Sequence, residues 1–193
     1  MHGFGDVRFF DRVARVYDVL MPPTRDPPLR EGLALADRNV ERVVDLGGGT
    51  GRAVRALDVE RPLVVDVSEG MLRRAAGHGI AAVRADAGTL PLRDGAVDAV
   101  VVVDALHHVP DRRAALAEAS RVLADGGVLV VREFDPGTLP GRVLELTERA
   151  MGFDSTFDGP DALARSVADA GLDAAVLDRG FGYTVAGLKR GSQ

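Results

Sequence analysis

The feature that most constrains the fold of this chain is an apolar run that ends in an acid and then breaks into glycines. The run begins at Val43 and ends at Asp45, and the glycine-rich turn occupies residues 47–51. A second apolar run, residues 63–65, ends in Asp66. Acids and glycines at two successive strand ends are typical of a nucleoside-cofactor site at the carboxyl edge of a parallel sheet.

The acid before the turn bears on which cofactor binds. A dinucleotide brings a pyrophosphate to such a turn, where a helix N-terminus favours anions, and Asp45 opposes that ligand. S-adenosylmethionine brings an ammonium and a sulfonium, which a carboxylate favours. A G-x-G-x-x-G pattern that starts at Gly47 also meets Arg52 where it needs Gly or Ala. These residues favour S-adenosylmethionine, with an NAD-dependent oxidoreductase as the alternative enzyme class.

The rest of the chain alternates strand and helix patterns. Val-rich runs predict strands at residues 41–46, 62–66, 80–85, 97–103 and 127–133. Their continuous apolar character suits strands that are buried on both faces of a parallel sheet. Helices are predicted at 50–58, 69–77, 111–124, 139–151 and 160–170, and an antiparallel hairpin at 174–178 and 183–188. The sequence therefore predicts an α/β, Rossmann-like, doubly wound and mostly parallel seven-stranded sheet with an antiparallel C-terminal strand.

The N-terminal part precedes this alternation. Residues 7–20 and 29–38 have helical patterns, and two proline pairs separate them, because a residue before proline is disfavoured in a helix. We expect a single domain over residues 1–193. Its parts are predicted to be an N-terminal helical lid (1–38), a cofactor-binding core (39–135), and substrate-side helices with the terminal hairpin (136–193).

Five segments resemble, in order and spacing, the motifs of class I S-adenosylmethionine-dependent methyltransferases. They are residues 43–51, 64–72, 84–92, 98–109 and 121–127. The resemblance is strong over residues 40–135, and residues 10–18 are similar to the N-terminal helix of the quinone-biosynthesis C-methyltransferases in the small-molecule branch. It implies methyl transfer from S-adenosylmethionine to a small acceptor, such as a quinone-type or other hydrophobic ring compound. A protein that binds the cofactor without turnover is the alternative outside the enzymes.

The resemblance also implies the cofactor-binding residues. Asp45 would hold the methionyl end, Asp66 would accept hydrogen bonds from both ribose hydroxyls, and Asp86 would accept one from the adenine amino group. For Asp86 the alternative is a solvated turn acid, and for Tyr17 on the lid helix it is a core-facing aromatic. The full implied set is Tyr17, Asp45, Gly47, Gly49, Asp66, Val67, Met71, Asp86, Ala87 and Asp104.

A histidine pair, His107 and His108, follows the fourth predicted strand. A histidine there can accept a proton from the acceptor, because its pKa lies near neutrality. The alternative is that one ring orients the loop while the other packs. We expect no metal site, because adjacent histidines do not converge easily on one ion and further ligands are not obvious. Glu133 and Asp135, which end the fifth strand, are each either substrate ligands or solvated acids.

Composition excludes several other classes. The chain has no cysteine, which excludes disulfides and thiol catalysis. A net charge of -5 without a basic cluster disfavours nucleic acid as substrate. Because the sequence holds neither a run of 18 apolar residues nor a signal-peptide pattern, we expect a cytoplasmic protein with no transmembrane segment. Its oligomeric state does not follow from the sequence.

Overall fold

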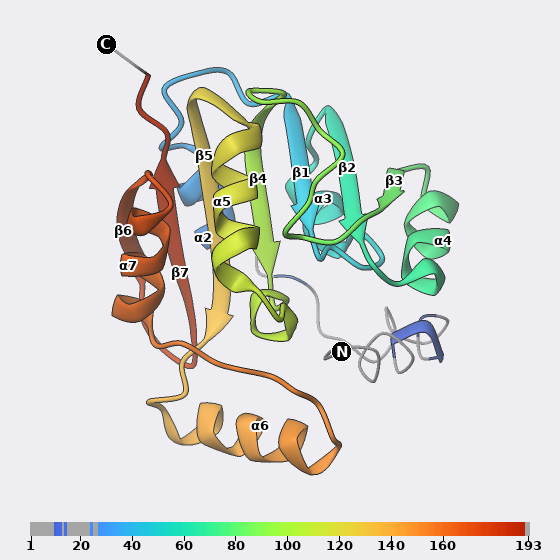
Figure 1. The fold of residues 1–193 in the computed structure, drawn as a ribbon, viewed down its shortest axis with the longest axis vertical. Helices are drawn as coiled ribbons and strands as arrows, with labels where there is room; N and C mark the ends of the chain where they lie inside the picture. Colours follow the sequence, from blue (N-terminus) through green and yellow to red (C-terminus); the bar gives the residue numbers. More distant parts are fainter. Residues whose placement is uncertain (1–9, 13, 15–23, 25–26, 192–193) are drawn as a thin grey trace.

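The computed structural model describes residues 10–12, 14, 24 and 27–191. Within them, seven strands form one sheet in the order β3-β2-β1-β4-β5-β7-β6 (Figure 1). Strands β1 to β5 pair in parallel, and β7 runs antiparallel to both of its neighbours. This arrangement confirms the predicted sheet. The strands are β1 Arg42–Leu46, β2 Arg61–Asp66, β3 Ala81–Arg84, β4 Val97–Val103, β5 Leu123–Phe134, β6 Asp173–Asp178 and β7 Gly182–Leu188.

Helices cover both faces of the sheet. One core cluster joins Val100 and Val102 of β4 to α5 and α7, which lie in front of the sheet in Figure 1. A second cluster joins Ala99 and Val101 to α2, α3 and α4. Alternate β4 side chains therefore serve opposite cores, which is why this strand is apolar without interruption from Ala99 to Val103. The helices are α2 Pro27–Leu33, α3 Arg52–Leu57, α4 Glu69–Gly77, the 3-10 turn η1 Leu106–His108, α5 Arg112–Val122, α6 Leu139–Ala150 and α7 Pro160–Asp169.

Helix α2 corrects the prediction of a helix over residues 29–38. It begins at Pro27, because a proline in the first helical turn lacks only an N–H that the helix would leave unused. It ends at Leu33, and the Asp37 amide donates to the Gly126 carbonyl instead of continuing the helix. Leu29 is fully buried against the sheet, so α2 is a layer of the core. The lid prediction for the residues before α2 stays a prediction.

The junction between α5 and β5 also differs from the prediction. The helix ends at Val122 and the strand begins at Leu123, where a helix to residue 124 and a turn to 127 were expected. The side-chain ammonium of Lys189 donates to the carbonyls of Ser120 and Leu123 at 2.8 and 2.7 Å. It thus satisfies carbonyls that a helix end leaves without partners. The predicted glycine turn lies inside the irregular first part of β5, where Gly126 has a φ of 75°.

Helix α6 lies beyond the carboxyl edge of β4 and β5, apart from the other helices (Figure 1). Much of its apolar surface is exposed, including Leu139, Val143 and Leu146. In the part of the chain that the structure describes, no helix is both long and apolar enough to cross a membrane.

The buried carboxylate of Asp98, near the start of β4, is expected to be a main electrostatic contribution to stability. It accepts hydrogen bonds from the backbone N–H of Arg42 at 2.9 Å and from its guanidinium at 2.7 Å. Although burial opposes it, this pairing holds the pKa of Asp98 well below its usual range. We therefore expect Asp98→Asn to lower the free energy of unfolding by about 2–3 kcal/mol at pH 7.

The stability that Asp98 contributes should also depend on pH. A carboxyl with a depressed folded-state pKa stabilises the protein above its unfolded-state pKa, and the contribution is lost as the pH falls further. Urea unfolding at pH 7 and pH 3 should therefore show a smaller difference between wild type and Asp98→Asn at pH 3. Asp94→Asn is the control, because its carboxylate is 82% exposed. A difference that is equal at both pH values would contradict the prediction.

Candidate functional site

A cavity of about 670 Å³ lies at the carboxyl ends of β1, β2, β3 and β4. The strand order reverses between β1 and β4, and ligands of open α/β sheets bind at such a switch point. Tyr17 lies outside the described residues. The other residues predicted to bind the cofactor all line this cavity, namely Asp45, Gly47, Gly49, Asp66, Val67, Met71, Asp86, Ala87 and Asp104.

The glycine turn brings backbone rather than side chains to the cavity. Gly47 has a φ of 68°, in the left-handed region that favours glycine. Gly48, which the sequence argument did not single out, also lines the cavity, and a Cβ there would collide with the carboxylate of Asp45. Three successive glycines in the sequence were the available signal for this close approach.

Asp45 is the most unusual acid of the site. Its side chain is fully buried, and neither carboxylate oxygen has a hydrogen-bond partner among the described residues. Burial raises the pKa of Asp45 to about 7, and the nearby backbone N–H of Val54 offsets part of the rise without reaching hydrogen-bond geometry. A buried carboxylate without a partner is costly. The cavity therefore presents an acceptor that a cationic or N–H-bearing ligand can satisfy.

Asp66 connects the turns that follow β1 and β2. Its Oδ2 accepts from the Gly49 amide at 2.9 Å, and its Oδ1 accepts from the Ser68 amide at 2.8 Å. Burial raises the pKa of Asp66, and these backbone donors oppose the rise. Each oxygen keeps a second acceptor position. The carboxylate is thus held rigidly, with capacity for two further donors such as neighbouring hydroxyls.

The next part of the cavity combines apolar surface with an acid. Val67 is 39% exposed although it is apolar, and Met71 is buried beside it. The Oδ1 of Asp86 accepts from the Gly88 amide at 2.8 Å in a local turn. That turn uses one carboxylate oxygen and leaves Oδ2 for a ligand. An exposed apolar surface next to an acceptor suits a flat heterocycle with an amino group.

Asp104, directly after β4, is a fourth acid of the cavity. Its φ of 52° is unusual for a residue other than glycine, and its amide donates to the Arg132 carbonyl at 3.0 Å. Burial, and then the charge of Glu133, raise the pKa of Asp104 to about 6. Backbone strain of this kind concentrates at functional sites. Asp104 joins Asp45 and Asp66 in giving this end of the cavity acidic character.

The structure separates the roles of the two histidines. His108 lines the cavity, whereas His107 is buried beside it and is absent from the lining. The Nδ1 of His107 lies 2.7 Å from Oε2 of Glu133, and its ring stacks on Phe157. Although burial opposes it, Glu133 raises the pKa of His107. Glu133 itself is buried under this ring, so it is neither the solvated acid nor the substrate ligand considered from the sequence.

His108 is enclosed mainly by other rings. Its ring makes edge contacts with Phe10 and Phe153, and its Nδ1 lies 3.2 Å from the Ser155 hydroxyl. Burial, together with the neighbouring His107, lowers the pKa of His108 to about 3. The ring is therefore neutral at physiological pH, and its role as proton acceptor stays a prediction.

The N-terminal segment contributes residues that the sequence argument did not assign. Phe10 lines the cavity. The Oδ1 of Asp11 accepts from the Ser68 hydroxyl at 2.7 Å and from the Gly70 amide at 2.8 Å, at the start of α4. Those hydrogen bonds lower the pKa of Asp11. Both residues begin the segment 10–18 that resembles the N-terminal helix of known methyltransferases, which was the available signal.

Comparison with known proteins agrees with this geometry. A family model described as "Methyltransferase domain" matches residues 44–131. A demethylmenaquinone methyltransferase from Clavibacter sepedonicus is 38% identical over 143 residues, which are 68% of this chain and 58% of that protein. One from Beutenbergia cavernae is 36% identical over 180 residues, 83% of this chain and 74% of that protein. For the first three such relatives, the chain spans only 58% to 61% of their length.

Solved structures support the same fold. An S-adenosylmethionine-dependent methyltransferase from Thermotoga maritima has a TM-score of 0.78 and 24% identity, and the match covers 95% of this chain and 99% of that one. At this identity the likeness shows the fold alone. The relative from Beutenbergia cavernae, which the chain matches over most of both lengths, decides the family. The chain therefore belongs to the S-adenosylmethionine-dependent methyltransferases, in the group that includes the demethylmenaquinone methyltransferases.

Proposed function

We propose that this protein transfers a methyl group from S-adenosylmethionine to a small, hydrophobic ring compound. The observation that carries the proposal is the buried carboxylate of Asp45, whose oxygens have no hydrogen-bond partner within the described residues. The ammonium of S-adenosylmethionine supplies the donors that this carboxylate lacks, whereas a pyrophosphate would be repelled. When bound, S-adenosylmethionine supplies a methyl group on a sulfonium, which is already a reactive electrophile.

The other residues of the cavity complete the binding of this cofactor. Asp66 accepts from the two ribose hydroxyls, using the acceptor positions that its backbone contacts leave. Val67 and Met71 pack on the adenine ring. Asp86 accepts from the adenine amino group, and the Ala87 amide donates to the ring. The protein's contribution to the reaction is then to hold the methyl donor in line with the acceptor and to exclude water.

The acceptor end is rich in aromatic rings. Phe10 stacks with Phe153 at a centroid distance of 6.1 Å, and His108 lies edge-on to both. Such walls favour a flat apolar ring, which can stack or lie edge-on against them. The relatives are named for methylation of demethylmenaquinone, and a quinone-type ring fits the same description.

We also propose that the N-terminal segment acts as a lid over the cofactor. Asp11 anchors this segment to the start of α4, and Phe10 reaches the cavity wall. A lid in this position excludes water from the reacting groups. Hydrogen exchange of the amides of residues 10–14 is expected to slow when S-adenosylhomocysteine binds. Exchange that is already slow in the free protein and does not change on binding would identify the segment as a fixed layer.

The activity test uses labelled S-adenosylmethionine with a panel of quinol, phenol and amine acceptors. Methylation of a ring acceptor, lost in Asp45→Asn, is the expected result. Calorimetry with S-adenosylhomocysteine and NADH separates the alternatives, because an oxidoreductase binds NADH preferentially. Binding of S-adenosylhomocysteine without methylation of any acceptor would favour a non-catalytic binding protein.

Recognition of adenine by Asp86 can be tested with a single change in the ligand. The inosine analogue of S-adenosylhomocysteine replaces the amino donor by a carbonyl, which faces the Asp86 carboxylate unfavourably. We expect wild-type protein to bind this analogue about tenfold more weakly than S-adenosylhomocysteine, a loss of about 1–2 kcal/mol. In Asp86→Ala the two ligands should bind alike, and in the exposed control Asp94→Ala the tenfold preference should remain. Equal binding of both ligands by wild type would show that Asp86 does not read the base.

A further inference from the structure

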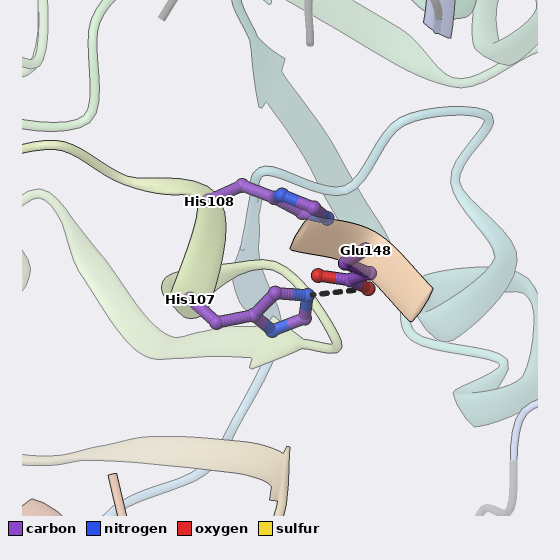
Figure 2. Close-up of side chains that lie close together, drawn as sticks. All are labelled: His107, His108 and Glu148. Carbon is purple, nitrogen blue, oxygen red and sulfur yellow. Dashed lines mark ion pairs between the residues drawn. The ribbon is translucent and has the colours of Figure 1, made fainter. Parts of the chain in front are cut away.

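Three side chains at the acceptor end of the cavity form a cluster that cofactor binding does not use. His107 and His108 extend from the turn η1, and Glu148 extends from α6 toward them (Figure 2). One ligand atom from each residue lies within 4.8 Å of the other two. We propose that His107, His108 and Glu148 bind a divalent transition-metal ion of the zinc class.

The two rings converge although they are adjacent in the sequence. Their centroids lie 4.1 Å apart, because the 3-10 turn places them side by side. Nε2 of His107 and Oε1 of Glu148 are 3.7 Å apart. Ligands about 2.0–2.1 Å from one tetrahedral zinc stand about 3.3–3.4 Å apart, so a small closure of the cluster suffices. The 3-10 turn thus brings the two adjacent rings closer together than we expected from the sequence.

The contact between His107 and Glu133 orients the His107 ring so that its other nitrogen can bind a metal. Nδ1 of His107 is held by Glu133 at 2.7 Å, so Nε2 is the atom that faces Glu148. A carboxylate on the far nitrogen is the usual support of a metal-binding histidine, since it fixes the tautomer and orients the ring. Nδ1 of His108 lies 3.2 Å from the Ser155 hydroxyl, and this ring contributes one of the ligand atoms that lie within 4.8 Å of those of His107 and Glu148.

The burial of Glu148 supports the metal site independently of the histidines. Other residues of α6 such as Val143 and Leu146 are 56% and 63% exposed, whereas Glu148 is 8% exposed. Its Oε2 is buried and has no hydrogen-bond partner among the described residues. An uncompensated buried carboxylate oxygen is costly, and the contact with His107 engages only Oε1. A cation between the three side chains removes this cost.

Two imidazoles and one carboxylate suit zinc, cobalt, iron or nickel, and they leave coordination positions for other ligands. His108 lines the cavity, so an ion held by its ring would lie beside the proposed acceptor end. A role for the ion in the reaction rests on the proposed function: an ion held here is placed to polarise an acceptor oxygen. Metal binding as such is independent of that function.

The test measures metal binding directly. Full-length protein, freed of metal with a chelator, is titrated with Zn²⁺ by calorimetry and with Co²⁺ by visible spectroscopy. We expect one ion per chain and ligand-field bands of a four- or five-coordinate cobalt. Glu148→Gln and His108→Gln should each weaken binding at least about a hundredfold, and loss of the orienting carboxylate in Glu133→Gln about ten- to a hundredfold. The matched controls are Glu145→Gln, on the same helix, and His78→Gln, and they should bind within threefold of wild type.

Absence of the cobalt bands, or unchanged affinity in Glu148→Gln and His108→Gln, would overturn the proposal. Thermal unfolding of each variant verifies that it is folded. If Glu133→Gln does not fold, His108→Gln still tests the proposal. S-adenosylhomocysteine binding to the metal-free protein is measured in parallel. If S-adenosylhomocysteine binds but no metal does, the metal site is refuted and the proposed function stands. If metal binds but S-adenosylhomocysteine does not, the metal site stands and the proposed function is refuted.

Discussion

Asp45→Asn is expected to weaken S-adenosylhomocysteine binding at least about a hundredfold, or about 3 kcal/mol, while making the free protein more stable. Binding falls because the variant replaces the acceptor of the ammonium with a neutral amide. Stability rises because the carboxylate is fully buried without a partner, and its raised pKa of about 7 shows that ionisation is unfavourable in the fold. After the cost of burying the new amide, we expect an increase in Tm of about 3–6 °C at pH 8.

The ionisation of Asp45 should also make stability and S-adenosylhomocysteine affinity depend on pH. A carboxyl whose folded-state pKa is raised holds its proton in the folded protein between about pH 4 and pH 7, so its contribution to stability falls as the pH rises through that range. S-adenosylhomocysteine needs the ionised form, so its affinity should decrease about tenfold for each pH unit below 7. Calorimetry from pH 6 to 8 and thermal unfolding check both slopes, with Asp94→Asn as the control. An Asp45→Asn protein that kept the wild-type pH dependence would contradict the assignment.

Asp66→Ala is expected to weaken S-adenosylhomocysteine binding about thirty- to a hundredfold, which corresponds to about 2–3 kcal/mol. The variant removes the acceptor of the ribose hydroxyls and also leaves the amides of Gly49 and Ser68 without their acceptor. A second ligand separates these two effects. Wild type should bind the 2′,3′-dideoxy analogue much more weakly than S-adenosylhomocysteine, whereas Asp66→Ala should bind the two ligands almost equally.

Two outcomes of this experiment would contradict the proposed role of Asp66. If Asp66→Ala changes the affinity less than threefold, the residue does not bind the cofactor. If the variant loses affinity but still distinguishes the two ligands as wild type does, Asp66 acts only by holding the turns. Asp66→Asn retains one acceptor oxygen and should fall between wild type and Asp66→Ala.

Local sequence alone was enough to predict which acids and glycines line the cavity at the carboxyl edge of the sheet. Asp45 and Asp66 lie at the carboxyl ends of β1 and β2, Asp104 directly follows β4, and the carboxyl ends of parallel strands meet at one edge of the sheet. The glycine turn had to follow the first strand, because only glycine adopts the left-handed conformation of Gly47 without strain. Each of these features depends on residues close in sequence and on the regular geometry of a doubly wound sheet.

The arrangement around the histidine pair was decided by contacts between residues that are distant in sequence. Glu133 could not be identified as the partner of His107, 26 residues away, until β5 was paired beside β4. Glu148 belongs to a helix that was predicted correctly, yet its burial depends on where α6 lies, and not on helical periodicity. The free energy of burying a charged or polar side chain depends on the partners that meet it. Sequence therefore determined which strands present acids to the cavity, while only the tertiary structure decided which histidine packs, which lines the cavity, and which carboxylate joins them.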